Sequence, residues 1–211
     1  MRIPAHIGII PDGNRRWAVS NGMNKENGYA SGLDPGLAVF KMCEEVGVKE
    51  ITYYGFTIDN NKRPLIQRQA FTDACVNAVN MLAKENASLL VVGNIESPMF
   101  PNELSSFTTR QTFGKGGMKV NFLVNYGWEW DLSNMKTAKK ANVHNSIMSF
   151  DISRIDLIIR WGGRRRLSGF LPVQSVYSDF YIIDQYWPDF EPAHFYEALE
   201  WYDKQDITLG G

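Results

Sequence analysis

Residues 7–17 read I-G-I-I-P-D-G-N-R-R-W, and this stretch decides the fold. The apolar run 7–10 predicts a buried strand, residues 11–14 a tight loop, and residues 15–20 the start of a helix. At the C-terminal edge of a parallel sheet, such a loop gathers backbone N–H groups and a helix N-terminus around one point, which favours an anion. Because Asp12 would repel a bare phosphate, a divalent cation between the two is the economical interpretation. An ordinary strand–turn–helix with Asp12 and Gly13 as turn residues explains the pattern about as well.

Composition narrows the class of protein. The chain has 211 residues, 44% of them hydrophobic, and a net charge of −1. This length fits one domain over residues 1–211 with a sizeable core, and no linker or repeat divides it. A nucleic-acid partner is not indicated, because no uniform basic surface is present. Phosphate recognition must therefore come from a local cluster of basic residues.

The cysteines, the N-terminus and the lengths of the apolar runs indicate the cellular compartment. Cys43 and Cys75 are the only cysteines, and both fall in predicted helices, so we expect buried thiols and a reducing compartment. The N-terminus resembles no secretory signal, and no apolar run is long enough for a transmembrane segment. A soluble, cytoplasmic protein is expected.

Apolar runs and helical periodicity alternate along the chain. After the first strand, the pattern predicts strands at 48–56, 89–92, 118–124, 155–159 and 180–183. It predicts helices at 37–46, 67–82, 103–113, 133–145 and 194–202, with residues 34–36 as the end of a loop. The alternation favours an α/β fold with a mostly parallel central sheet flanked by helices and joined by right-handed crossovers.

Polar residues follow three of these strands, at residues 12–16, 59–63 and 160–168. Open α/β sheets bind ligands at the C-terminal ends of their strands, so these loops are the expected site. Guanidinium groups can hold diphosphates in a bidentate manner, and the candidates are Arg16, Arg63, Arg160 and Arg166. A solvated turn at 59–63, and an exposed turn or nucleic-acid patch at 160–166, remain open as alternatives.

Five ordered motifs then suggest a family. They are H-I-G-I-I-P-D-G-N-R-R-W-A (6–18), F-T-I-D-N-N-K-R-P (56–64), V-N-Y-G-W-E-W-D (124–131), D-L-I-I-R-W-G-G-R-R-R-L-S-G-F-L (156–171), and Q-S-V-Y-S-D-F-Y with W-P-D-F (174–190). Together they resemble the cis-prenyltransferase family of the undecaprenyl diphosphate synthase type. The resemblance implies a homodimer of α/β subunits, each with an apolar channel beneath its diphosphate sites.

The resemblance also implies roles for individual residues. Asp12 would position Mg²⁺ and an allylic diphosphate, and Asp179, which stands where the family usually has glutamate, would contribute to the metal site. The residues expected to line the first diphosphate and assist its ionisation are Gly13, Asn14, Arg15, Arg16, Trp17, Asn60 and Arg63. Arg160, Arg166 and Ser168 would hold the second diphosphate.

The expected reaction begins when an allylic diphosphate ionises, and a second prenyl diphosphate then attacks through its double bond. Tyr54, Phe56 or Trp161 would offer aromatic faces to the allylic cation. The proton acceptor stays open between the released diphosphate and a polar residue such as Asn60 or Tyr29. The expected substrates are dimethylallyl diphosphate and, as further options, isopentenyl or longer allylic diphosphates.

The departures from the family pattern gather at the diphosphate sites. Tyr29 replaces a histidine, Asn61 a tryptophan, Lys25 an arginine and Arg164 an acidic residue. This set resembles the irregular branch of the family, which joins two allylic units head-to-middle to lavandulyl or cyclolavandulyl diphosphates. Drift at each position is the alternative, and it would leave regular cis condensation with isopentenyl diphosphate.

Three other classes of protein fit the sequence less well. A non-catalytic partner subunit of a prenyltransferase typically lacks the first aspartate, whereas Asp12 is present. A dinucleotide-binding enzyme would need G-x-G-x-x-G after a strand, and an all-helical prenyl synthase would need paired aspartate-rich motifs. The chain has neither motif.

Overall fold

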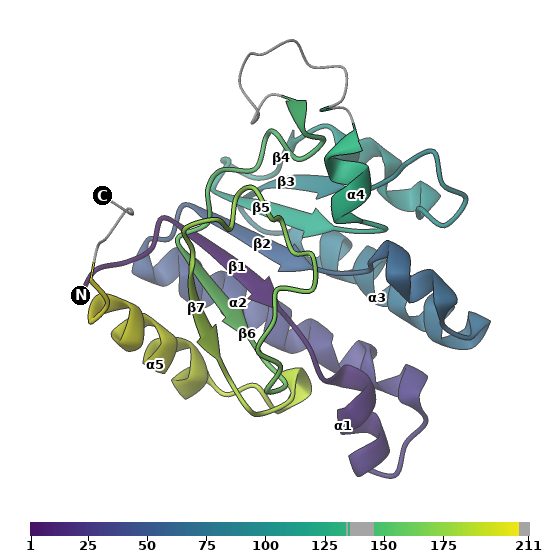
Figure 1. Ribbon diagram of the computed structural model, residues 1–211, viewed down its shortest axis with the longest axis horizontal. Helices are drawn as coiled ribbons and strands as arrows, with labels where there is room; N and C mark the ends of the chain where they lie inside the picture. Colours follow the sequence, from purple (N-terminus) through teal and green to yellow (C-terminus); the bar gives the residue numbers. More distant parts are fainter. Residues whose placement is uncertain (134, 136–145, 207–211) are drawn as a thin grey trace.

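A computed structural model of the chain describes residues 1–133, 135 and 146–206. In this part of the chain, seven strands form one sheet in the order β4-β3-β5-β2-β1-β6-β7. The strands are β1 (His6–Ile10), β2 (Glu50–Tyr54), β3 (Ala87–Val92), β4 (Gln111–Thr112), β5 (Met118–Leu123), β6 (Leu157–Arg160) and β7 (Asp179–Ile182). All neighbouring strands pair in parallel except β3 and β4, which confirms the predicted α/β fold with a mostly parallel sheet (Figure 1).

The first strand lies in the interior of the sheet, next to its central strand β2. β1 pairs in parallel with β2 on one side and with β6 on the other. Every residue of β1 is buried, as its apolar sequence requires. Its last residue, Ile10, is in register with Arg160 at the end of β6, so the loops that follow these two strands begin side by side.

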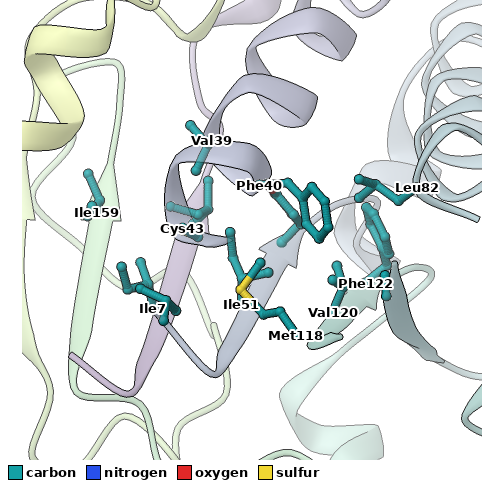
Figure 2. Close-up of a cluster of buried hydrophobic side chains, with 14 of the residues drawn as sticks. Ile7, Val39, Phe40, Cys43, Ile51, Leu82, Met118, Val120, Phe122 and Ile159 are labelled. Carbon is teal, nitrogen blue, oxygen red and sulfur yellow. The ribbon is translucent and has the colours of Figure 1, made fainter. Parts of the chain in front are cut away.

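The longest helices, α2 (Leu33–Val46), α3 (Leu65–Leu82) and α5 (Pro192–Asp203), cover one face of the sheet. The other α-helices are α1 (Asn14–Ser20) and α4 (Trp128–Asp131). The 3₁₀ helices are η1 (Lys25–Gly28), η2 (Ala30–Gly32), η3 (Ile58–Lys62), η4 (Asn102–Thr108) and η7 (Trp187–Asp189). Figure 2 shows the core between α2 and the sheet, where Phe40 and Val39 lie over Ile7, Ile51 and Phe122.

The opposite face is covered without long helices. There, Phe170 and Leu171 pack with Ile10, Tyr54 and other buried side chains in a second apolar cluster. Residues 146–178 run in front of the sheet in Figure 1 with little regular structure besides β6. A Cβ at position 8 would lie 2.6 Å from Phe170 Cε1, so Gly8 lets that ring lie directly against β1.

A polar network anchors this irregular segment to the sheet. Glu50 accepts hydrogen bonds from Asn121 Nδ2 at 2.7 Å and from Ser153 Oγ at 2.6 Å. His6 Nε2 lies 2.8 Å from Thr52 Oγ1. Burial lowers the pKa of His6. Burial alone would raise the pKa of Glu50, but the nearby His6 and the hydrogen bonds from Ser153 and Asn121 together outweigh it, so the pKa of Glu50 is lowered.

The structure corrects two predicted elements. Helix α2 begins at Leu33, because Pro35 sits in its first turn, where no backbone N–H is needed. Residues 103–113 are not an α-helix: η4 is followed by the short antiparallel strand β4. The predicted helix 133–145 falls almost entirely outside the described residues.

Two expectations about the chain's surroundings can be compared with the structure. Cys43 and Cys75 are free and buried, as predicted. In the described part of the chain, no helix is both long and apolar enough to cross a bilayer.

Candidate active site

The loops that follow β1, β2 and β6 surround a cavity of about 840 Å³. Because the parallel strands all end at this edge, three segments far apart in sequence meet here. Most of the predicted site residues line the cavity: Asp12, Gly13, Asn14, Arg15, Arg16, Tyr29, Tyr54, Asn60, Arg63, Arg160, Arg166 and Ser168. The structure thus brings together all three polar sets that the sequence singled out.

The cavity is strongly cationic. Counted over the described residues, two carboxylates line it, those of Asp12 and Asp59. Seven basic side chains line it as well: Arg15, Arg16, Lys25, Arg63, Arg160, Arg164 and Arg166. In a chain of net charge −1, this excess of positive charge is local, and it suits more than one multiply charged anion.

Asp12 lies between two guanidinium groups. Arg160 Nη2 donates to Asp12 Oδ2 at 2.8 Å, and Arg16 Nη2 lies 3.4 Å from Asp12 Oδ1. Arg160 is only 3% exposed and also donates to Ser168 Oγ at 3.0 Å and to the carbonyl of Arg166. Its buried Nε has no hydrogen-bond partner in the part of the chain that the structure describes.

A second constellation surrounds Tyr29. The Tyr29 hydroxyl accepts a hydrogen bond from Arg63 Nη1 at 2.9 Å, and the ring stacks on Phe71 with 4.6 Å between centroids. Burial raises the pKa of Tyr29, more than the nearby Arg63 and Arg15 lower it. Burial also lowers the pKa of Arg63, although arginine keeps its charge in proteins. Tyr29 is therefore a neutral phenol that orients a charged guanidinium.

Two further predicted residues have structural contacts. Asn60 Oδ1 accepts the backbone N–H of Thr57 and so caps helix η3. The Tyr54 hydroxyl donates to the carbonyl of Ser168 at 2.7 Å, and burial raises the pKa of Tyr54. Tyr54 thereby ties the end of β2 to the loop after β6.

Four predicted residues do not line the cavity. Trp161 and Phe56 are fully buried in the main core, where Trp161 packs against Trp187 with 4.7 Å between ring centroids. Trp17 instead donates to Asp189 Oδ1 at 2.6 Å. Asp179 is the first residue of β7 and pairs with Leu157, so it lies at the N-terminal edge of the sheet, opposite Asp12. The structure does not support the expected substrate contacts of the first three, nor a shared metal site of Asp179 and Asp12 within one chain.

The structure adds residues that were not predicted as site residues. Lys25 and Arg164 had been noted only as departures from a motif, yet both line the cavity. Tyr186 also lines it, with its ring 5.0 Å from the guanidinium carbon of Arg16. No sequence signal marked Tyr186, because its position depends on how the chain after β7 folds back to Gly13.

A small apolar pocket adjoins the cationic cavity. It measures about 80 Å³ and lies between α2, α3 and the sheet. Pro11, Asn14, Tyr29, Tyr54 and Phe71 line both spaces, so the apolar pocket opens where the cationic groups converge. Tyr53 and Phe122, stacked with 5.3 Å between centroids, also line it.

The chain matches a known family over nearly its whole length. Residues 10–210 match the family described as "Putative undecaprenyl diphosphate synthase". The chain is 33% identical to an isoprenyl transferase of Chromobacterium violaceum, across 98% of this chain and 88% of that protein. It is 27% identical to a ditrans,polycis-undecaprenyl-diphosphate synthase ((2E,6E)-farnesyl-diphosphate specific) of Aliivibrio fischeri, across 99% and 89%.

A solved structure has the same fold. Lavandulyl diphosphate synthase from Lavandula x intermedia, in complex with dimethylallyl diphosphate, superposes with a TM-score of 0.84. The match covers 99% of this chain and 98% of that one, at 21% sequence identity.

Proposed function

The chain belongs to the undecaprenyl diphosphate synthase family of prenyltransferases, and on that premise we propose that it joins two short prenyl diphosphates. One observation carries the proposal: a cationic cavity with room for two diphosphates opens onto an apolar pocket of about 80 Å³. The pocket has about half the volume of a cavity that holds benzene, about 150 Å³, so a five-carbon isoprenyl group would fill it and extend into the adjoining cationic cavity. The substrate of the pocket would then be dimethylallyl diphosphate.

The residues present fit the Mg²⁺ that the family uses. Mg²⁺ is commonly held by one or two carboxylates together with substrate phosphate oxygens. Among the described residues, no group of three or more histidine, cysteine, aspartate or glutamate side chains could hold a metal, so Asp12 would be the protein ligand and diphosphate oxygens would complete the set. When bound there, Mg²⁺ would neutralise charge on the departing diphosphate.

The protein's own groups would prepare ionisation of the allylic substrate. Arg63, oriented by Tyr29, and the Arg15 and Arg16 side chains would hold the leaving diphosphate, each well-placed donor lowering the barrier by about 3 kcal/mol. As the C–O bond breaks, the allylic cation would lie near Tyr54, Tyr29 and Phe71, the aromatic residues at the boundary of the two spaces. A cation–π contact contributes about 0.5–2 kcal/mol.

The second substrate would bind through Arg160, Arg166 and Ser168 and attack with its double bond. A carbon–carbon bond forms, and a proton leaves the resulting cation. Burial raises the pKa of Tyr29 and keeps it a protonated phenol, which is a poor proton acceptor, and Asn60 Oδ1 already accepts the backbone N–H of Thr57. We therefore assign the proton to the released diphosphate.

We propose irregular, head-to-middle coupling of two dimethylallyl diphosphates to a lavandulyl or cyclolavandulyl diphosphate. Three substituted positions support this choice by their location: Tyr29, Lys25 and Arg164 all line the cationic cavity. The lavandulyl diphosphate synthase shares the fold, but at 21% identity the likeness carries no more than that. The names of the relatives favour the alternative, which is regular cis condensation with isopentenyl diphosphate.

Product analysis separates the two reactions. The purified protein is incubated with Mg²⁺ and dimethylallyl diphosphate alone, and in parallel with isopentenyl diphosphate added. Product from dimethylallyl diphosphate alone would support irregular coupling. Product only in the mixture with isopentenyl diphosphate would support regular cis condensation instead. Asp12→Ala should abolish turnover in both mixtures with an unchanged circular dichroism spectrum. Full activity in that variant would remove Asp12 from the mechanism.

We also propose that the protein is a homodimer. Strand β7 is an edge of the sheet in the described part of the chain, and Val176 and Tyr177 beside it are 65% and 56% exposed. An unpaired edge next to exposed apolar side chains is typical of an association surface. Sedimentation of wild type and Val176→Asp should give a dimer and a monomer, respectively. A monomeric wild type would contradict the proposal.

A further inference from the structure

Asp12 and Arg160, which are expected to bind ligands of opposite charge, form an ion pair with each other. Asp12 is the expected protein ligand of the metal, and Arg160 is expected to hold the second diphosphate. In the structure, Arg160 Nη2 donates to Asp12 Oδ2 at 2.8 Å. The pair is set into the protein, because Arg160 is 3% exposed and the Asp12 side chain 32%.

Because of this contact, the metal ion must compete with Arg160 for Asp12, and the diphosphate must compete with Asp12 for Arg160. A cation at Asp12 would meet the guanidinium of Arg160, which already neutralises the carboxylate. An anion at Arg160 would meet the carboxylate of Asp12, which already satisfies Nη2. The guanidinium is nonetheless incompletely bound, because its buried Nε has no partner in the described part of the chain. Within the described residues, one donor of the guanidinium is therefore unsatisfied while Arg160 is paired with Asp12.

We propose that the Asp12–Arg160 ion pair is an electrostatic latch that couples binding of the metal to binding of the second diphosphate. The diphosphate draws Arg160 away from Asp12 and frees the carboxylate for the cation. The cation in turn releases Arg160 for the diphosphate, because linkage between two binding sites is reciprocal. The inference rests on the proposed function for the identity of the two ligands, but the pair itself can be tested with each ligand alone.

The first test uses a cation without any diphosphate. Mn²⁺ binding is followed by electron paramagnetic resonance for the wild type and Arg160→Gln. Opening the latch should tighten Mn²⁺ binding by about fivefold or more, the usual lower range of such couplings. Arg166→Gln is the matched control: it removes the same charge from the same cavity, but Arg166 contacts Arg160 through its backbone carbonyl, which the substitution keeps. Equal tightening in both variants would overturn the latch, because general charge would then explain the effect.

The second test uses an anion without any metal. Pyrophosphate binding is measured by calorimetry in the presence of a chelator for the wild type and Asp12→Asn. Freeing Arg160 should tighten pyrophosphate binding by about fivefold or more. Asp59→Asn is the control, because Asp59 lines the same cavity but pairs with Lys62 Nζ at 2.9 Å. The latch is refuted if Asp12→Asn binds pyrophosphate no more tightly than Asp59→Asn.

The two tests distinguish a failure of the latch from a failure of the proposed function. Arg160 is buried, so folding of its variant is checked by thermal denaturation; if Arg160→Gln does not fold, the pyrophosphate test alone decides. Mn²⁺ binding that persists in Asp12→Asn/Arg160→Gln would place the metal elsewhere and contradict the proposed role of Asp12. Tighter pyrophosphate binding in Asp12→Asn would support the latch even in that case.

Discussion

Neighbouring residues in this protein face different surroundings, and the Arg160–Trp161 dipeptide shows the consequence. Arg160 ends β6 and reaches the cationic cavity, whereas Trp161 turns into the core beneath the helices. Side chains alternate between the two faces of an extended segment, so Trp161 points to the face opposite to that of Arg160. The sequence alone predicted both as site residues, because the alternation can be applied only when the end of the strand is known.

Tyr29 offers a test at the residue scale. Tyr29→Phe keeps the ring that stacks on Phe71 but removes the oxygen that accepts from Arg63. A hydrogen bond to a charged group is worth about 1.5–3 kcal/mol, so kcat should fall by roughly tenfold or more. The melting temperature should change little, because the ring stays buried. Steady-state kinetics and thermal denaturation measure the two effects.

A second variant serves as the control. Tyr181→Phe, which removes a hydroxyl from a ring that packs on Trp201 outside the cavity, should leave kcat unchanged. A fall in melting temperature without a fall in kcat for Tyr29→Phe would show that the hydroxyl serves folding alone.

At the scale of elements, parallel pairing explains why most of the site could be predicted. Loops that follow parallel strands gather at one edge, so the polar sets after β1, β2 and β6 had to meet. The same rule explains Asp179: it begins β7, and the first residue of a parallel strand lies at the other edge. The order of the strands could not be predicted from the sequence. The contact between Asp12 and Arg160 and the position of Tyr186 beside Arg16 depend on that order, so they could not be predicted either.

The stacked aromatic pair that lines the apolar pocket gives a prediction for β2 and β5. Phe122→Ala should enlarge this pocket and admit longer prenyl chains. Truncating a buried phenylalanine also costs about 3–5 kcal/mol of folding free energy. Mass spectrometry of dephosphorylated products formed with longer allylic diphosphates would detect the change.

The control for this prediction comes from the same strand. Val120 is fully buried on the same face of β5 but does not line the pocket. Val120→Ala should destabilise the protein without changing the range of accepted chains. Identical product profiles for Phe122→Ala and wild type would show that another element limits the chain.

At the scale of the whole molecule, the irregular covering of one sheet face depends on buried ionisable groups. Glu50 and His6 both have lowered pKa values in the folded state, and Glu50 binds Ser153 in the covering segment. A lowered pKa gives stability that is present above the unfolded pKa, about 6.5 for histidine and 4.3 for glutamate, and is lost as pH falls through the folded value. The free energy of unfolding should therefore decrease as pH falls from 7 toward 4.

Urea unfolding at several pH values measures this dependence. His6→Gln should flatten the part of the curve just below pH 6.5, because glutamine does not titrate there. His194→Gln is a suitable control, since His194 lies on α5 away from this network and bonds the backbone N–H of Glu191. An unchanged slope in His6→Gln would assign the pH dependence to other groups.

The register of β1 and β6 has one more consequence. Ile10 pairs with Arg160, and adjacent strands lie about 4.8 Å apart in any sheet. The distance between the starting points of the two diphosphate-binding loops is thus set by the backbone spacing of β1 and β6, which side-chain substitutions do not change. Descendants of this chain could exchange Tyr29, Lys25 or Arg164 and reach new products, while the spacing of the two reactants stayed as the sheet laid it down.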